Sequence, residues 1–202
     1  MINASFTVDP RKRNTREEYE KIKKGEGADL LKDKSHKKSH KDIDARWTKK
    51  NNETFYGYKN HAKVDVKSKF INTFVVTSAS VQNSLATDDL LDENDEGQEL
   101  YAESAYTGET QEETIALYKM INKVHEKEYR NNPLTDEQKK KNTEKSRTGA
   151  RVGHVFGFME QSMNRLNLKS IGIVRETGII KLINLTYNLF RYEQVIRLNI
   201  LT

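Results

Sequence analysis

The chain changes its hydrophobic period between its two halves, and this change limits the folds it can adopt. Residues Ile2–Val8 alternate apolar and polar side chains, which is the period of a partly buried strand. Three further stretches are rich in aromatic and β-branched residues and predict an antiparallel meander: Thr54–Tyr58, Ala62–Val66 and Phe70–Ser80. Later in the chain, apolar residues recur at helical spacing instead. We therefore expect an α/β protein whose strands come mainly first and whose helices come mainly last.

The middle of the chain predicts shorter elements. A short acidic helix is expected near Ala86–Leu91, and Glu99–Ala105 has strand character that ends in a turn at Thr107-Gly108. Residues Glu112–Val124 carry apolar side chains at helical spacing, and Pro133 prevents that helix from continuing.

Two long helices are expected at the C-terminal end. Thr135-Asp136-Glu137-Gln138 is a capping-box start, which predicts a helix that runs towards Met163. Glycines at positions 149, 153 and 157 each cost about 1 kcal/mol of helix propensity, so a kink or interruption is expected there. Residues Ile171–Leu198 are apolar around the whole helical wheel, which predicts a helix that is buried or covers a partner.

The composition excludes several classes of protein and site. A chain of 202 residues is long enough for one domain with a proper core, spanning residues 1–202. It contains no cysteine, which excludes disulfides, thiolate metal sites and cysteine nucleophiles. No run approaches the roughly 18 apolar residues of a membrane span, and no signal peptide is evident. We expect a soluble, cytoplasmic protein without a membrane partner.

Charge is distributed very unevenly along the chain. Residues 11–50 contain fifteen Lys or Arg against eight Asp or Glu, residues 70–118 contain eleven acidic residues and no basic one, and residues 119–151 contain ten basic against five acidic. A nuclease-like domain would have such blocks if carboxylates gathered metal while flanking cations held phosphates. Ordinary solvated surface is the alternative.

The first basic block reads as an insertion after the first strand. Residues 10–43 are expected to be flexible, with a short helix around Arg16–Lys24. His36 and His40 are four residues apart and could place two metal ligands on one helical face, but no third ligand lies nearby in the sequence.

Five stretches of sequence carry a resemblance to a known family. They are Asp44-Ala45-Arg46-Trp47-Thr48-Lys49-Lys50 followed by Phe55-Tyr56-Gly57-Tyr58-Lys59-Asn60-His61, then Tyr101-Ala102-Glu103-Ser104-Ala105-Tyr106, then Arg151-Val152-Gly153-His154-Val155-Phe156-Gly157, and finally Tyr187-Asn188-Leu189-Phe190-Arg191-Tyr192. Their order and spacing resemble the bacterial insertion-sequence DDE transposases of group five within the group-four superfamily, over essentially the whole chain. The resemblance implies an RNase H-like catalytic domain, a mixed sheet flanked by helices, with DNA as partner and Mg²⁺ or Mn²⁺ as cofactor.

The same resemblance implies an Asp on the first strand, an Asp at the end of a central strand and a Glu on a late helix, which together hold two divalent metals. Here these positions align with Asn3, Glu103 and Gly153. We expect the metal site to be lost or badly weakened, with Glu103 as a weak metal ligand. Other carboxylates are poor substitutes, because Glu160 lies about 10 Å further along the helix and Asp9 about 20 Å along the first strand.

The chain begins almost at the first catalytic strand, whereas family members carry a preceding helical region associated with recognition of the element's ends. We therefore expect an N-terminally truncated, catalytically inactive transposase remnant that still binds the DNA backbone. Stacking on bases is expected from aromatic residues, although Trp47 is about as well explained by a place in the core. The candidate contacts are Lys49, Lys50, Lys59, Lys63, Arg147 and Arg151 for phosphates, and Trp47 and Tyr58 for stacking.

Two other functions are also compatible with the sequence. One is residual metal-dependent DNA cleavage that uses Glu103. The other is an interaction module, in which the helix over Ile171–Leu198 pairs with a second copy or with an intact transposase subunit and inhibits it. The ordinary alternative for that helix is burial in the core.

Overall fold

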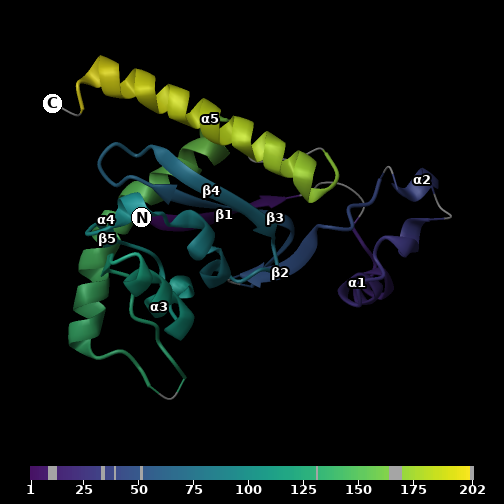
Figure 1. Cartoon of the computed structure of the whole chain (residues 1–202), viewed down its shortest axis with the longest axis horizontal. Helices are drawn as coiled ribbons and strands as arrows, with labels where there is room; N and C mark the ends of the chain where they lie inside the picture. The colour runs from purple at the N-terminus through teal and green to yellow at the C-terminus, as the bar shows by residue number, and fades with distance from the viewer. Residues whose placement is uncertain are drawn as a thin grey trace.

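The computed structural model describes residues 1–8, 13–32, 35–38, 40–50, 52–130, 132–163 and 170–200 (Figure 1). Its centre is a sheet, with two long helices against one face and a series of short turns against the other. The sheet is built from β1 (Ile2–Val8), β2 (Arg46–Lys50), β3 (Glu53–Val64) and β4 (Ile71–Ser78).

The long strand β3 organises the sheet, because it pairs antiparallel with β1, β2 and β4. The prediction of separate strands at Thr54–Tyr58 and Ala62–Val66 was wrong. The polar residues between them continue the strand, since their backbone groups pair with neighbouring strands. Gly57 lies where the pairing of β3 passes from β2 to β1, and its φ of 147° is a conformation that favours glycine.

A short parallel pair forms a separate two-stranded sheet beside β1. It consists of β5 (Glu99–Leu100) and β6 (Ile121–Asn122). The backbone N–H of Ile2 donates to the carbonyl of Tyr101 at 2.9 Å, which places the continuation of β5 beside β1. The strands are thus mostly antiparallel, with one parallel pair beside them, and helices flank them in the expected α/β arrangement.

The middle of the chain differs from the prediction. The expected acidic helix is replaced by short 3₁₀ turns at Asn83–Ala86, Asp88–Leu90 and Glu93–Asp95. The expected strand over residues 99–105 is shorter than predicted and consists of β5 alone, because a further 3₁₀ turn begins at Ser104. Helix α3 (Glu109–Leu117) ends earlier than predicted, since Lys119 adopts a positive φ and the following residues pair as β6.

Both long C-terminal helices are present as α4 (Asp136–Ser162) and α5 (Ile173–Leu198). The capping box at Thr135 and Gln138 is formed as predicted. The expected interruption of α4 was wrong, because the helix runs unbroken through its three glycines. Packing explains this, since Val155 and Met159 are fully buried against the sheet and offset the poor helix propensity.

Residues of the C-terminal motif fasten α5 to the turn between β3 and β4. The Tyr187 hydroxyl donates to the carbonyl of Lys69 at 3.1 Å, and Nε of Arg191 donates to the carbonyl of Ser68 at 2.6 Å. The Asn188 side chain bonds both backbone groups of Ile71. These bonds replace strand partners that the edge of β4 would otherwise lack.

Two aspartates hold the start of the same helix. Oδ2 of Asp42 accepts the backbone N–H of Gly172 at 2.9 Å, and Oδ2 of Asp44 accepts that of Ile173 at 3.0 Å. A carboxylate at a helix N-terminus satisfies free N–H groups and suits the helix dipole. The segment from Asp42 to Asp44, where the first motif begins, therefore positions α5.

The basic insertion lies at one end of the sheet (Figure 1). It contains the expected short helix as α1 (Arg16–Lys23), a 3₁₀ turn at Asp29–Leu31, and α2 (Ser35–Lys38). Nδ2 of Asn14 donates to the Tyr56 hydroxyl at 2.9 Å and so ties the insertion to β3. None of the helices in the described part of the chain has the length and apolar character needed to cross a membrane.

Candidate nucleic-acid interface

A groove of about 360 Å³ opens on the sheet face opposite α4 and α5. Strand pairing creates its floor, since Phe6 on β1 lies directly opposite Lys59 on β3. The groove contains cationic, amide and apolar side chains, and no acidic residue is among those found to line it. Its lining consists of Ala4, Phe6, Thr48, Lys49, Lys50, Lys59, Gln82, Asn83, Ala105 and Lys127.

Lys59 is held firmly in the floor of the groove. Its Nζ donates to the carbonyl of Val81 at 2.7 Å and to Oδ1 of Asn83 at 3.1 Å, and it lies 5.3 Å from the centre of the Phe6 ring. Burial, together with the nearby charge of Lys50, lowers the pKa of Lys59. An anion in the groove would offset this cost by adding the opposite charge.

The rim of the groove carries more accessible cations. Lys49 and Lys50 are exposed on the short strand β2, and Lys127 is exposed after β6. At the margin, Nζ of Lys50 lies 4.0 Å from Oε2 of Glu103, and both side chains are half exposed. Such a weak surface pair leaves Lys50 available to a phosphate.

Aromatic residues support the groove from below. The rings of Phe6 and Phe55 are stacked, with centroids 4.3 Å apart and planes 8° apart. This stack packs β1 against the start of β3 beneath the lysines.

The aromatic residues predicted to stack on bases are placed differently. Tyr58 is fully buried and its hydroxyl donates to Oδ2 of Asp42 at 2.6 Å, so the prediction of a stacking role for Tyr58 was wrong. Trp47 is half-buried against Tyr56, and the Arg13 guanidinium lies 4.9 Å over its ring. Trp47 therefore packs mainly as a core residue, which was the alternative to a stacking role.

The remaining predicted cations are not in the groove. Lys63 is buried between Asp92 and Asp95, with Nζ–O distances of 2.7 and 2.8 Å, so it is occupied and is not a free phosphate contact. Burial would lower its pKa, but the hydrogen bonds to the two carboxylates raise it. Arg147 is exposed on α4. Arg151 belongs to the same helix, but its side chain lies outside the described residues.

The three positions predicted to correspond to the acidic triad lie on adjoining elements. Asn3 is on β1, where its Oδ1 accepts the N–H of Ala4 at 2.8 Å, and Glu103 follows the segment hydrogen-bonded to β1. Helix α4 runs along β1, because a methyl group added at Gly149 would lie 3.2 Å from Cε of Met1 and Glu160 accepts a hydrogen bond from Ser5 at 3.2 Å. Gly153 lies between these two contacts, next to open space.

The donor set at these positions does not fit a two-metal centre. Asn3 offers one amide oxygen that is already bonded, Glu103 offers one carboxylate, and Gly153 offers no side chain. Within the ranges given above, no three His, Asp or Glu side chains come together as metal ligands, and this includes His36 and His40. Asp9 lies outside the described residues.

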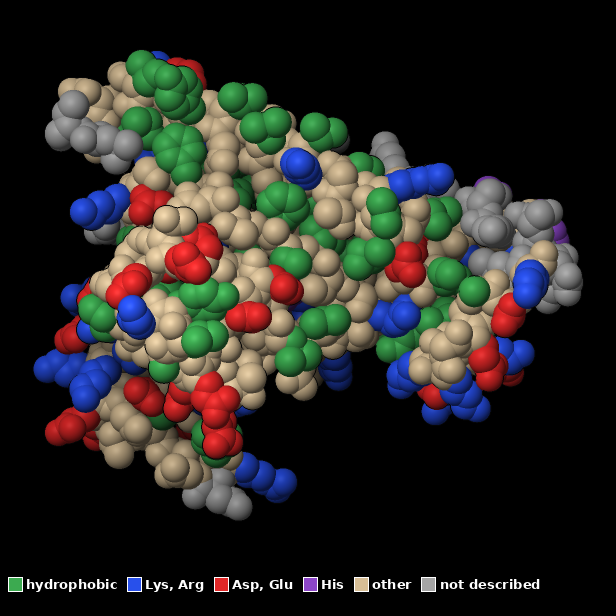
Figure 2. All heavy atoms as spheres, in the orientation of Figure 1, with side chains coloured by type: hydrophobic (Ala, Val, Ile, Leu, Met, Phe, Trp, Pro, Cys, Tyr) green, Lys and Arg blue, Asp and Glu red, His purple; other side chains and the backbone are tan. Residues whose placement is uncertain are grey.

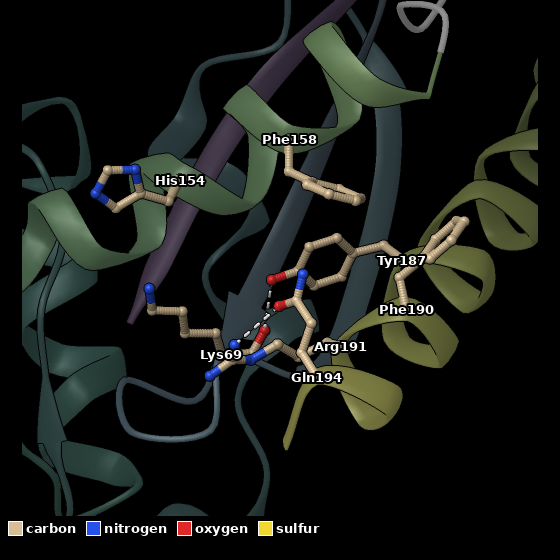
Figure 3. A pocket seen from close by; sticks show the side chains of 7 residues that line it. All are labelled: Lys69, His154, Phe158, Tyr187, Phe190, Arg191 and Gln194. Atoms are coloured by element: carbon tan, nitrogen blue, oxygen red, sulfur yellow. Dashed lines mark hydrogen bonds between the residues drawn. The ribbon is translucent and has the colours of Figure 1, made fainter. Parts of the chain in front are cut away.

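A smaller hollow of about 120 Å³ lies between α4, α5 and the β3–β4 turn (Figure 3). Phe158, Tyr187 and Phe190 form edge-to-face pairs there, with centroids 5.8–5.9 Å apart. Arg191 also donates to Oε1 of Gln194 at 3.1 Å and so is engaged in holding the helix. We assign this hollow to the attachment of α5.

Sequence reasoning missed one cation of the groove, Lys127. It lies within the third charge block, yet nothing in the local sequence separates it from its neighbours. Only the fold of the segment after β6 brings it to the groove.

Comparison with known proteins agrees with this architecture. A family model described as the transposase DDE domain matches residues 24–189. The transposase for insertion sequence element IS1106 from Neisseria meningitidis serogroup B is 26% identical over 151 residues, which is 75% of this chain and 52% of that protein. The chain thus spans about half the length of this curated relative. No solved structure gives a significant match.

Proposed function

Because the chain belongs to the transposase DDE domain family of DNA transposition, whose fold is RNase H-like, we propose that it binds the DNA backbone without cutting it. The groove that contains Lys49, Lys50, Lys59 and Lys127 would hold the phosphates. The observation that carries the proposal is the convergence of these four lysines, from three separate parts of the sequence, in one groove whose known lining has no acid.

Backbone binding follows from the chemistry of the groove. Each phosphate neutralised by a lysine releases condensed counterions, which drives association and makes it depend on salt. Groups that read base edges are few there, since Gln82 and Asn83 are the amides among the lining residues and Asn83 is bonded to Lys59. We therefore expect binding with little sequence preference.

We also propose that the chain has lost the ability to cut DNA. Transposase DDE domains use divalent metal ions, and those ions require several carboxylates to offset their mutual repulsion. Asn3, Glu103 and Gly153 supply a single carboxylate between them. We therefore propose that this chain does not cleave DNA.

The test is a titration of a labelled 20-base-pair duplex, followed by fluorescence anisotropy at several salt concentrations. A variant with Lys49→Gln, Lys50→Gln and Lys127→Gln should bind at least tenfold more weakly at about 0.1 M salt, and its salt slope should be smaller by about 2 to 3. These three side chains are exposed, so the fold should survive the change.

The matched control is Lys139→Gln, Lys140→Gln and Lys141→Gln at the exposed start of α4, which removes the same charge outside the groove. This control should bind within about threefold of the native chain. Equal losses in both variants would mean that only net charge matters, and an affinity independent of salt would rule out phosphate binding altogether.

A further inference from the structure

The groove contains one lysine that a flexible strand can reach more easily than a rigid duplex. Lys59 lies in the floor and is only 7% exposed, whereas Lys49, Lys50 and Lys127 stand exposed around it. The volume of about 360 Å³ is in the range of pockets that hold small ligands, about 300–1,000 Å³. A double helix is far wider than such a pocket and keeps its bases inside, so it can contact only the lysines at the rim. A single strand can bring a phosphate to Lys59 and a base to the apolar side chain of Phe6.

An exposed aromatic ring continues the groove beyond Lys127. Nζ of Lys127 lies 5.6 Å from the centre of the Tyr129 ring, and Tyr129 is 56% exposed. A cation beside an aromatic ring combines a contact for a phosphate with a surface for a neighbouring base, which is the arrangement of grooves that bind single strands. Tyr129, rather than the buried Tyr58, is thus able to stack on a base.

The backbone holds this ring out from the body of the protein. Tyr129 and Asn132 exchange two backbone hydrogen bonds, of 3.3 and 3.0 Å, which fix the chain at the position of the ring. The segment around them projects from the lower edge of the molecule in Figure 1. Figure 2 shows the outline of the molecule indented between this projection and the basic insertion, with Lys and Arg side chains on both sides of the indentation. A strand that passes Lys127 therefore meets a ring whose position is already set.

We propose that the groove takes single-stranded DNA in preference to duplex, with one base stacked on Tyr129 and the phosphates held by the four lysines. This inference rests on the proposed DNA-binding groove and adds to it the form of the DNA. Stacking accepts every base, because each base has an aromatic face, and so it agrees with the small number of base-reading groups in the groove. Duplex DNA offers no such face along its length, since its bases are stacked on one another.

The test compares a labelled 20-nucleotide single strand with the duplex formed from it, by fluorescence anisotropy on the full chain. At about 0.1 M salt, the native chain should bind the single strand at least tenfold more tightly than the duplex. Tyr129→Ser should weaken single-strand binding about tenfold and change duplex binding by less than about twofold. The salt slope of this variant should stay that of the native chain, because stacking releases no counterions.

Two variants control for the chemistry and the place of the ring. Tyr129→Phe keeps the ring and should bind both forms of DNA as the native chain does. Tyr192→Ser removes an equally exposed ring, 58% against 56%, from α5 outside the groove, and should leave both affinities unchanged.

The outcomes separate this inference from the proposed function. Duplex binding as tight as single-strand binding, or equal losses in Tyr129→Ser and Tyr192→Ser, would overturn the preference for single strands while the DNA-binding groove stands. Binding of both DNA forms that does not depend on salt would instead rule out the groove itself, and this inference with it.

Discussion

At the scale of single residues, two motif residues that were predicted to stack on DNA bases, Trp47 and Tyr58, serve the architecture instead. Tyr58 and Asp42 form a buried hydrogen bond, and Asp42 also holds the start of α5. Burial raises the pKa of Tyr58, and its hydrogen bond to Asp42 adds to this effect. An alternating strand pattern could not distinguish such a residue from an exposed aromatic, because the side of β3 that is covered depends on where α5 packs.

His61 gives the chain a predictable dependence on pH. It is fully buried on β3, where Nε2 lies 2.9 Å from the Thr77 hydroxyl and Nδ1 has no hydrogen-bond partner among the described residues. Burial, with the nearby charge of Lys59, lowers the pKa of His61 to about 4. In the unfolded chain its pKa returns to about 6.5, so between these values the unfolded state binds the proton and folding is weakened as the pH falls.

Because of His61, we expect the free energy of unfolding to be about 2 kcal/mol lower at pH 5 than at pH 7. Urea unfolding at the two pH values measures this loss. His61→Gln keeps a hydrogen-bonding side chain but does not titrate. The free energy of unfolding of this variant should therefore differ between pH 7 and pH 5 by about 2 kcal/mol less than that of the native chain, even if the variant is less stable at both pH values. An identical pH dependence in both proteins would show that folding does not change the pKa of His61.

At the scale of elements, α4 shows packing overriding propensity. Its three glycines favour a break, yet the apolar residues Val155, Phe156 and Met159 on its inner side hold the helix to the sheet. The glycines are not equivalent, because an added methyl group meets nothing within 4 Å at Gly153 but lies 3.2 Å from Cε of Met1 at Gly149.

This difference predicts the outcome of two matched substitutions. Gly153→Ala should raise the free energy of unfolding by about 1 kcal/mol, through better helix propensity and a less free unfolded chain. Gly149→Ala should gain less, since the Met1 side chain must move. Thermal or urea unfolding measures both. A destabilising Gly153→Ala would mean that the space beside this position is filled in solution.

At the scale of the whole molecule, the alternating charge blocks do not meet as one acidic metal centre ringed by cations. The acidic block from residue 70 to 118 forms much of the cover over one sheet face, and two of its carboxylates neutralise Lys63. The accessible lysines instead meet in the groove. Of the nuclease-like interpretation of the charge blocks, only the grouping of cations therefore agrees with the structure.

If the fold retains the geometry of the family's site, restoring the acids should restore metal binding. We expect a variant with Asn3→Asp, Glu103→Asp and Gly153→Glu to bind Mn²⁺ at least tenfold more tightly than the native chain in a calorimetric titration. The open space at Gly153 leaves room for the new side chain. The control places the third change at Gly157, which is also open but about 6 Å further along the helix.

The two outcomes separate clearly. Binding by the Gly153 variant alone would identify the native chain as a transposase scaffold that lost its metal ligands. Equal binding by the native chain would show that Asn3, Glu103 and Gly153 are not the site.

The sequence by itself determined the first strand, the two long helices and the family, because strong periodicity, a capping box and ordered motifs are local signals. It could not determine that two predicted strands are one, that α3 ends at Leu117, or that Tyr58 is buried, since each depends on pairing or packing with distant residues. Of the candidate phosphate contacts, sequence found Lys49, Lys50 and Lys59. Only the tertiary structure showed that Lys127 lines the groove and that Lys63 is paired with Asp92 and Asp95. The sequence could not show this, because whether a lysine is paired depends on which carboxylates the fold brings to it.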